Sequence, residues 1–147
     1  MTPQPPHPAC GPFDCLGTSA RLVDRTISAI YDDALRPLGI RVTQMGVLVV
    51  LARLGGGTAT EIAQMLRMDK STVSRSLDRL IDSGWVTADE GADARTQPLT
   101  LTRSGRAMID RSAPAWAEAQ EHVRTLVGDA FADKLVRTAE KLMNQPQ

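Results

Sequence analysis

The segment from Lys70 to Arg79 carries the side chains best suited to chemistry in this chain. Serine and threonine hydroxyls bond to phosphates or base edges, and a long arginine reaches guanine in the major groove of DNA. The residues of this segment that we predict to contact DNA are Lys70, Ser71, Thr72, Ser74, Arg75 and Arg79. An ordinary amphipathic helix with a solvated polar face has a similar pattern, so the neighbouring elements must decide between the two interpretations.

Two short helices joined by a tight turn would position these side chains. Thr58 and Glu61 form a Thr-x-x-Glu capping box at the start of the first helix, and Asp69 is a good N-cap for the second. Apolar residues recur at helical spacing: Ile62, Ala63 and Leu66, then Val73, Leu77, Leu80 and Ile81. Gly84 tolerates the left-handed turn that ends a helix. The pattern predicts a helix-turn-helix whose second helix enters the major groove.

A short β-hairpin is predicted directly after the second helix. Residues 85–88 and 99–102 have the composition of two short strands. A hairpin in this position is a wing, so we expect Arg95 at its tip to enter a minor groove. Asp93 would hold that guanidinium or brace the loop. The alternative is a surface ion pair of little energetic weight.

Four signatures, taken together in their order and spacing, are specific. They are Leu38-Gly39-Ile40 to Thr43-Gln44, Asp69-Lys70-Ser71-Thr72-Val73-Ser74-Arg75, Asp93-Ala94-Arg95 and Leu101-Thr102-Arg103-Ser104-Gly105. From about Asp14 to its C-terminus the chain resembles the MarR-type regulators. The resemblance implies an obligate homodimer that binds a palindromic operator on double-stranded DNA, usually as a repressor. A small molecule or an oxidant would release the DNA, and Thr43 joins the predicted DNA contacts.

We therefore expect a mainly α fold with a small β-wing, a winged helix-turn-helix whose N- and C-terminal helices form a dimerisation domain. A mobile Pro-rich arm is predicted over residues 1–13, dimerisation helices over 14–37 and 103–147, and the DNA-binding lobe over 41–102. The terminal helices have apolar stripes but no sheet to cover, so packing on a second copy explains them best. The alternative is a monomeric helical bundle.

The composition fits one domain with an aliphatic core. The chain has 147 residues, of which 42% are hydrophobic, and its formal net charge is zero. DNA-binding domains are commonly basic, but from Arg41 to Arg79 six basic residues stand against three acidic ones, and the local field governs the encounter with DNA. The longest apolar run, 45–52, is far shorter than the roughly 20 residues of a membrane span, and no secretory signal is visible. We expect a cytoplasmic protein with no membrane partner.

Cys15 and Cys10 are the candidates for redox sensing. Cys15 lies near the start of the first predicted helix, where the helix dipole would stabilise a thiolate and favour its oxidation. Cys10 is close enough in sequence to form a disulfide with it. The organic-peroxide-sensing branch of the resembled family has its reactive cysteine near this point. Tyr31 matches one of the tyrosines that fix that cysteine, whereas Val42 stands where another is expected. A free cysteine also serves as a small buried hydrophobe.

A ligand pocket between the dimerisation helices and the DNA-binding lobe is the other route to sensing. The resembled family commonly binds small aromatic or amphipathic acids there, and an arginine facing an apolar cavity suits a carboxylate. The residues predicted to line this effector pocket are Arg21, Arg25, Tyr31, Met45 and Trp116. Plain packing between helices is the alternative for each of them.

No metal site, cofactor or enzymatic centre is predicted. His7, Cys10 and Cys15 lack a fourth metal ligand, and His122 has no catalytic company. A thiol-based redox enzyme using Cys15 would leave the wing and the polar helix face without a purpose. The favoured function is a homodimeric transcriptional repressor released from its operator by a small-molecule effector. The first alternative is a regulator that senses peroxide through Cys15.

Overall fold

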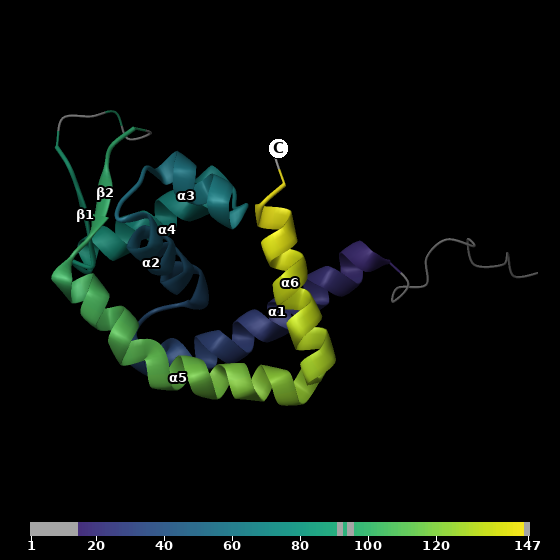
Figure 1. The fold of residues 1–147 in the computed structure, drawn as a ribbon. Coiled ribbons are helices and arrows are strands. Elements are labelled where there is room, and N and C mark those ends of the chain that lie inside the picture. Colours follow the sequence, from purple (N-terminus) through teal and green to yellow (C-terminus); the bar gives the residue numbers. More distant parts are fainter. Residues whose placement is uncertain (1–14, 91–92, 94–95, 146–147) are drawn as a thin grey trace, which may run out of the picture.

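The computed structural model describes residues 15–90, 93 and 96–145. In chain order its elements are α1 (Leu16–Leu35), η1 (Arg36–Leu38), α2 (Val42–Leu54), α3 (Ala59–Leu66), α4 (Lys70–Asp82), β1 (Val86–Ala88), β2 (Leu99–Leu101), α5 (Arg103–Val127) and α6 (Asp129–Met143). Figure 1 shows α2, α3 and α4 gathered in one lobe with the hairpin, while α1 and α5 lie together along its side and α6 turns back from the end of α5. The predicted mainly α fold with a small β-wing is confirmed.

The helix-turn-helix is held by the two caps that the sequence predicts. The Thr58 hydroxyl accepts a hydrogen bond from the Glu61 N–H at 3.2 Å, and the Glu61 carboxylate accepts one from the Thr58 N–H at 2.7 Å. The Asp69 carboxylate accepts a hydrogen bond from the Thr72 N–H at 2.8 Å at the start of α4. Arg67 ends α3 in the left-handed conformation, with a φ of 49°, and so turns the chain toward α4.

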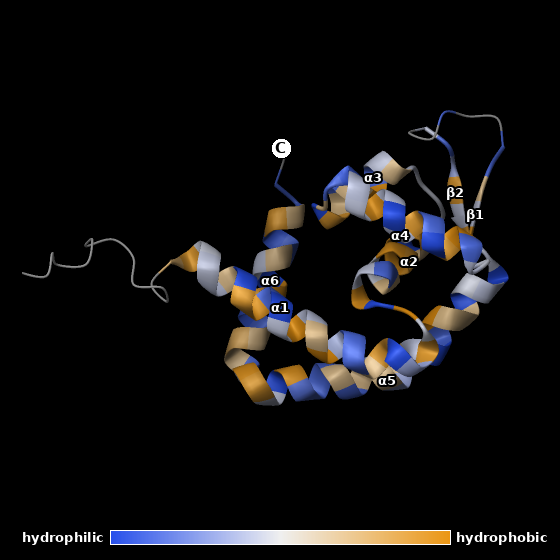
Figure 2. Ribbon diagram, turned by 180° about the vertical axis from the view of Figure 1, so that it is seen from behind, coloured by the Kyte–Doolittle hydropathy of each residue, from blue (hydrophilic) through white to orange (hydrophobic). Residues whose placement is uncertain are grey.

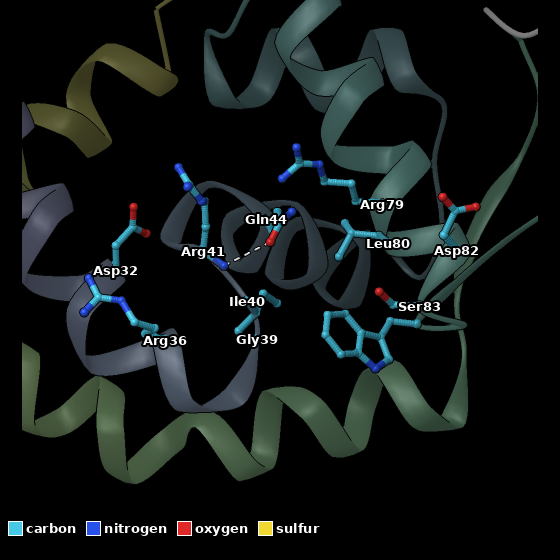
Figure 3. Close-up of a pocket in the computed structure, with 11 residues that line it drawn as sticks. Asp32, Arg36, Gly39, Ile40, Arg41, Gln44, Arg79, Leu80, Asp82 and Ser83 are labelled. Atoms are coloured by element: carbon cyan, nitrogen blue, oxygen red, sulfur yellow. Dashed lines mark hydrogen bonds between the residues drawn. The ribbon is translucent and has the colours of Figure 1, made fainter.

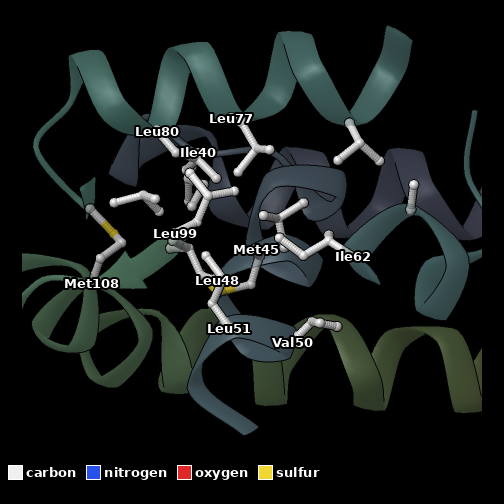
Figure 4. Packing of buried hydrophobic residues seen from close by; sticks show 14 of the residues in the cluster. Ile40, Met45, Leu48, Val50, Leu51, Ile62, Leu77, Leu80, Leu99 and Met108 are labelled. Carbon is white, nitrogen blue, oxygen red and sulfur yellow. The ribbon is translucent and has the colours of Figure 1, made fainter. Parts of the chain in front are cut away.

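An aliphatic core around α2 fixes which side of α4 faces inward. Figure 4 shows side chains from α2, α3, α4, β2 and α5 packed together in this core. Its most deeply buried large side chains are Leu35, Leu48, Leu51, Ile62 and Leu80. Burying one such side chain contributes about 1.5–3 kcal/mol. The polar face of α4 is therefore held outward by the packing of its apolar face.

One residue of the predicted apolar stripe of α4 does not lie in the core. Ile81 is 38% exposed, whereas Val73, Leu77 and Leu80 are buried. Ser76, which the apolar pattern omits, is buried in its place. Successive residues are about 100° apart around a helix, so the four buried residues share a narrow arc and Ile81 lies at its edge. The prediction for Ile81 was wrong for this geometric reason.

The wing consists of β1 and β2, which pair antiparallel with Val86 opposite Leu101. Leu99 is buried and also pairs with Gly57 through two backbone hydrogen bonds of 2.8 and 3.0 Å. This extra bridge fixes the root of the wing to the loop between α2 and α3. Both predicted strands are confirmed, each one residue shorter than expected.

The start of α5 is bonded to the segment that enters β1. Thr102 caps α5, because its hydroxyl accepts a hydrogen bond from the Gly105 N–H at 3.0 Å. The same hydroxyl donates to the Gly84 carbonyl at 2.7 Å, and the Thr102 N–H donates to the Trp85 carbonyl at 3.0 Å. Thr102 thus joins the end of β2 and the start of α5 to the residues that follow α4.

The helices at the two ends of the chain pack on each other. α1 and α5 lie side by side with a small cluster around Tyr31 between them. Gly128, with a φ of 82°, ends α5, and α6 turns back toward the lobe (Figure 1). The Arg124 guanidinium pairs across this break with Asp129 at 3.0 Å and with Asp133 at 2.8 Å. These two ion pairs hold α6 in its direction relative to α5.

Large apolar side chains remain exposed on the terminal helices, and Figure 2 shows where apolar residues lie along the ribbons of α1, α5 and α6. They are Leu16 and Leu22 of α1, Leu126 of α5, and Phe131, Leu135, Val136, Leu142 and Met143 of α6. Exposed side chains of this size are typical of helices that pack against a second protein. We call these eight residues the apolar terminal surface.

Among the described helices, no single one is both long enough and apolar enough to cross a bilayer. One pair, Leu16–Leu38 with Val42–Leu54, meets the length and composition criteria only when joined across a bend of 80°.

Candidate nucleic-acid interface

The outer face of α4 gathers the side chains that the sequence predicts to contact DNA. On this one helix Lys70, Ser71, Ser74, Arg75 and Arg79 are exposed, and Thr72 is half-buried. Thr43 is exposed near the start of α2, on a separate element. The structure therefore brings six of the predicted residues onto one face, because the apolar face of α4 is held in the core.

The cations of this face have no ion-pair partner within the described part of the chain. The ion pairs formed there involve Arg36 and Arg124 instead. Arg75 makes one long contact of 3.4 Å, in which its guanidinium donates to the Thr72 hydroxyl. Lys70, Arg75 and Arg79 can therefore meet phosphates or base edges without first breaking a salt bridge.

The N-terminal turn of α4 is organised by the Asp69 carboxylate. Its Oδ1 accepts hydrogen bonds from the Ser71 hydroxyl at 2.5 Å and from the Thr72 N–H at 2.8 Å, and its Oδ2 accepts one from the Thr72 hydroxyl at 2.6 Å. The hydrogen bond from the Ser71 hydroxyl, followed by those from Thr72, holds the pKa of Asp69 well below its usual range. Asp69 therefore stays ionised at neutral pH, as a pure hydrogen-bond acceptor.

Of the two wing residues predicted to contact DNA, the structure describes one. Asp93 is described, and its carbonyl accepts a hydrogen bond from the Thr96 N–H at 2.9 Å, which closes a tight turn. Arg95 lies outside the described residues, so its pairing with Asp93 and its insertion into a minor groove stay predictions. The predicted arm of residues 1–13, with Cys10, also lies outside them.

Cys15 stands immediately before α1, as the sequence predicts. Its side chain is half-buried, and its carbonyl accepts the first hydrogen bond of the helix from the Ser19 N–H at 2.9 Å. A helix N-terminus is a position at which the helix dipole stabilises a thiolate. The redox role of Cys15 stays a prediction.

The five residues predicted to line an effector pocket do not come together around one hollow. Arg21 and Arg25 are exposed on α1, and Met45 is buried in the main core. Tyr31 and Trp116 pack on each other with ring centroids 4.5 Å apart. The Tyr31 hydroxyl donates to the Gln120 side chain, and burial raises the pKa of Tyr31. In the single chain Tyr31 and Trp116 pack between α1 and α5, and the assignment of these five residues to an effector pocket stays a prediction.

A different hollow, of about 510 Å³, lies between the start of α2 and the end of α4 (Figure 3). It is lined by Asp32, Arg36, Gly39, Ile40, Arg41, Gln44, Arg79, Leu80, Asp82, Ser83 and Trp85. The Asp32 carboxylate accepts a hydrogen bond from the Val42 N–H at 2.8 Å, and the Gln44 side chain accepts one from the Arg41 N–H at 2.9 Å. These bonds fix the floor of the hollow and leave the Arg41 and Arg79 guanidinium groups beside it.

Sequence reasoning missed this hollow because its walls come from two segments that lie far apart in the sequence. Arg79 was assigned only to the DNA-contacting face, and Trp85 only to a strand. No periodicity or motif brings residues 32–44 and 79–85 together; the packing of α2 against α4 does so. The hollow and the DNA-contacting face share Arg79, so they are neighbours on one helix.

Comparison with known proteins identifies the lobe. Residues 38–96 match the model of the MarR family. An uncharacterised HTH-type transcriptional regulator of Bacillus subtilis, YwoH, is 33% identical over 88 residues, which are 60% of this chain. The chain spans 61% of the length of that relative.

Solved structures share the whole fold. The Mycobacterium tuberculosis transcriptional regulator MOSR, in complex with DNA, is 30% identical, with a TM-score of 0.71 over 87% of this chain and 96% of that one. BpsR of Bordetella bronchiseptica has a TM-score of 0.76 at 20% identity, over 93% of this chain and 99% of that one, which is a likeness of fold. Together with the family match over residues 38–96, these similarities show that the chain belongs to the MarR family of transcriptional regulators.

Proposed function

We propose that the protein is a homodimeric repressor that binds a palindromic operator through α4 and the wing. The observation that carries the proposal is the single exposed face of α4, on which hydroxyls stand beside cations that have no ion-pair partner among the described residues. A recognition helix enters the major groove with such a face. The structure of the M. tuberculosis relative is a complex with DNA, which supports this assignment.

The second copy is proposed to cover the apolar terminal surface. In this arrangement residues 14–37 and 103–147 are dimerisation helices, and residues 41–102 form the DNA-binding lobe. Two lobes related by a two-fold axis would place their α4 helices in successive major grooves about 34 Å apart. An operator of two inverted half-sites follows from this symmetry.

Release of the operator is proposed to follow the binding of a small-molecule effector, with the hollow beside Arg79 as its site. Arg41 and Arg79 supply positive charge, and Ile40 and Trp85 supply apolar contact, which suits a small aromatic or amphipathic acid. The DNA binding of BpsR, which shares this fold, is regulated by 6-hydroxynicotinic acid, and this supports an effector of the same chemical class. An occupant of the hollow would displace the end of α4 and so disturb its DNA-contacting face.

A thiol-based enzyme is not the function of this chain, because members of the MarR family are transcriptional regulators and not enzymes. The redox alternative differs from the proposed function only in the signal for release. It keeps the same DNA interface, and oxidation of Cys15 releases the operator.

Replacement of Arg75 with alanine is expected to remove sequence preference. Arg75 is exposed on the face of α4 and has no ion-pair partner among the described residues. One good arginine contact to a guanine is worth about 1–3 kcal/mol of discrimination, so the affinity ratio between operator and scrambled duplex should fall about tenfold or more. Fluorescence anisotropy with both duplexes measures this ratio. Arg106→Ala, which removes an exposed arginine from α5, is the control and should leave the ratio unchanged.

Replacement of Arg95 with alanine is expected to act differently. If Arg95 contacts the backbone of a minor groove, its loss weakens binding to operator and scrambled duplex alike. The slope of log K against log salt concentration should become smaller in magnitude by about one, the value expected for the loss of one phosphate contact. Salt titrations of the wild type and Arg95→Ala measure both effects. An unchanged slope would remove Arg95 from the interface while leaving the assignment of α4 intact.

A further inference from the structure

The Asp69 carboxylate determines what the hydroxyls at the start of α4 can offer to DNA. Its oxygens accept the hydroxyl protons of both Ser71 and Thr72, at 2.5 and 2.6 Å. A hydroxyl has one proton to donate and two lone pairs to accept with. Once its proton is held by Asp69, each of these hydroxyls can only accept a hydrogen bond from a further partner.

This limit matters because most hydrogen-bonding atoms of DNA are themselves acceptors. Phosphate oxygens accept, as do N7 and O6 of guanine, O4 of thymine and N7 of adenine. In the major groove only the amino groups of adenine and cytosine donate. A hydroxyl that can only accept therefore has two base partners there and no partner on the phosphate backbone.

We propose that Asp69 is a specificity-determining positioning residue, which holds the hydroxyl protons of Ser71 and Thr72 so that these hydroxyls select adenine or cytosine amino groups over phosphates. The inference rests on the proposed function, because it requires α4 to lie in a major groove. It goes beyond that function by assigning base chemistry to Ser71 and Thr72 and by giving a role to a residue that need not touch DNA.

Release of the hydroxyl protons by Asp69 is energetically unfavourable. Turning either hydroxyl outward to a phosphate would remove one of the hydrogen bonds that hold the pKa of Asp69 below its usual range. It would also leave an ionised carboxylate less well bonded while it approaches another anion, which is unfavourable on both counts. The remaining contact of Thr72, from the Arg75 guanidinium at 3.4 Å, is long and leaves its hydroxyl able to accept from a base.

Asp69→Asn tests the proposal because it reverses one hydrogen bond and keeps the cap. Asparagine caps helices about as well as aspartate, and its oxygen can replace Oδ1, which accepts from the Thr72 N–H and the Ser71 hydroxyl. Its amide nitrogen then replaces Oδ2 and donates to the Thr72 hydroxyl. Thr72 is thereby freed to donate its own proton, so its preferred base changes from adenine or cytosine to guanine or thymine, which present acceptors but no donor in the major groove.

The experiment measures the affinity of each variant for operators that carry each of the four base pairs at every position of a half-site. For the wild type we expect a position in each half-site that favours an amino-bearing base. In Asp69→Asn the relative affinity at that position should change about threefold to tenfold toward guanine or thymine, as expected for one hydrogen bond. Thermal unfolding of Asp69→Asn should match the wild type, which confirms that the cap is kept.

Thr72→Val provides the matched background, because it removes the hydroxyl while keeping a β-branched side chain. In Thr72→Val the further change Asp69→Asn should no longer alter base preference. The proposal is overturned if Asp69→Asn changes the affinity for all operators by one common factor, which is the result of charge alone. It is also overturned if the shift in preference persists without the Thr72 hydroxyl. A wild type with no base preference at any position would instead refute the proposed function itself.

Discussion

Replacement of Phe131 and Leu135 with aspartate is expected to produce a monomer that no longer binds its operator tightly. These α6 side chains are 44% and 40% exposed in the single chain, although each is large and apolar. A dimer that covers the apolar terminal surface buries four of these side chains, two from each protomer. Complete burial of one such side chain contributes about 1.5–3 kcal/mol. Even when four of them are only partly buried in the dimer, the variant that loses this burial should have a dimer affinity at least about a hundredfold lower.

Loss of the dimer should weaken operator binding strongly because each protomer has one α4. A monomer can occupy only one half-site, and it loses the advantage of binding the second half-site from the same complex. Sedimentation velocity over a range of protein concentrations measures the dimer, and anisotropy with the operator measures binding. Circular dichroism should show unchanged helix content, since both side chains lie outside the core.

Leu54→Asp is the matched control for this double variant. Leu54 is 43% exposed, close to the exposure of Phe131, but it lies at the end of α2 in the DNA-binding lobe. It should leave both the dimer and operator binding intact. If the double variant stays dimeric and Leu54→Asp does not, the second copy lies against the lobe and not against the terminal helices.

The connection between the terminal helices and the lobe explains how such a dimer could be regulated. α5 starts at the root of the wing, where Thr102 bonds to the Gly84 and Trp85 carbonyls. At the other end, the Arg67 guanidinium donates to the Leu142 carbonyl, which joins the end of α6 to the turn before α4. The lobe is thus held at two points by the helices proposed to form the dimer. In the proposed dimer, a change in the arrangement of these helices would alter the spacing of the two α4 helices.

Local chemistry made the caps and turns predictable from the sequence. The capping box of Thr58 and Glu61 and the cap at Asp69 each involve atoms no more than three residues apart. A pattern over such a short range contains all the participants, so its hydrogen bonds could be named in advance.

Features that depend on how distant elements pack were less predictable. The polar face of α4 was identified, because the inward stripe defines its opposite side, but Ile81 at the edge of that stripe was assigned wrongly. Tyr31 and Trp116 pack on each other between α1 and α5, and their place in an effector pocket stays a prediction. The hollow beside Arg79 and Trp85 has no local signature at all, since α2 and α4 build it together.

Replacement of Gly105 with alanine is expected to destabilise the fold strongly and to displace the wing. A Cβ at this position would lie 2.2 Å from the Trp85 carbonyl oxygen and 2.7 Å from Cδ1 of Leu101. The first of these is a backbone atom that also accepts a hydrogen bond from the Thr102 N–H, so it cannot move without breaking the junction of α5 with the wing. The free energy of unfolding should fall by at least about 2 kcal/mol, as for overpacking of a rigid core.

Gly46→Ala separates this steric effect from the general consequences of adding a methyl group to a helical glycine. Gly46 lies inside α2, and its nearest neighbour for a Cβ is the flexible Cδ2 of Leu66 at 3.9 Å, an ordinary contact. There the change should stabilise the protein by about 0.5–1 kcal/mol, because glycine loses more backbone entropy than alanine on folding. Chemical denaturation of both variants measures the two effects, which should have opposite signs. Equal stability of Gly105→Ala and the wild type would mean that the end of α4, the wing and α5 are not joined as tightly as the Thr102 hydrogen bonds indicate.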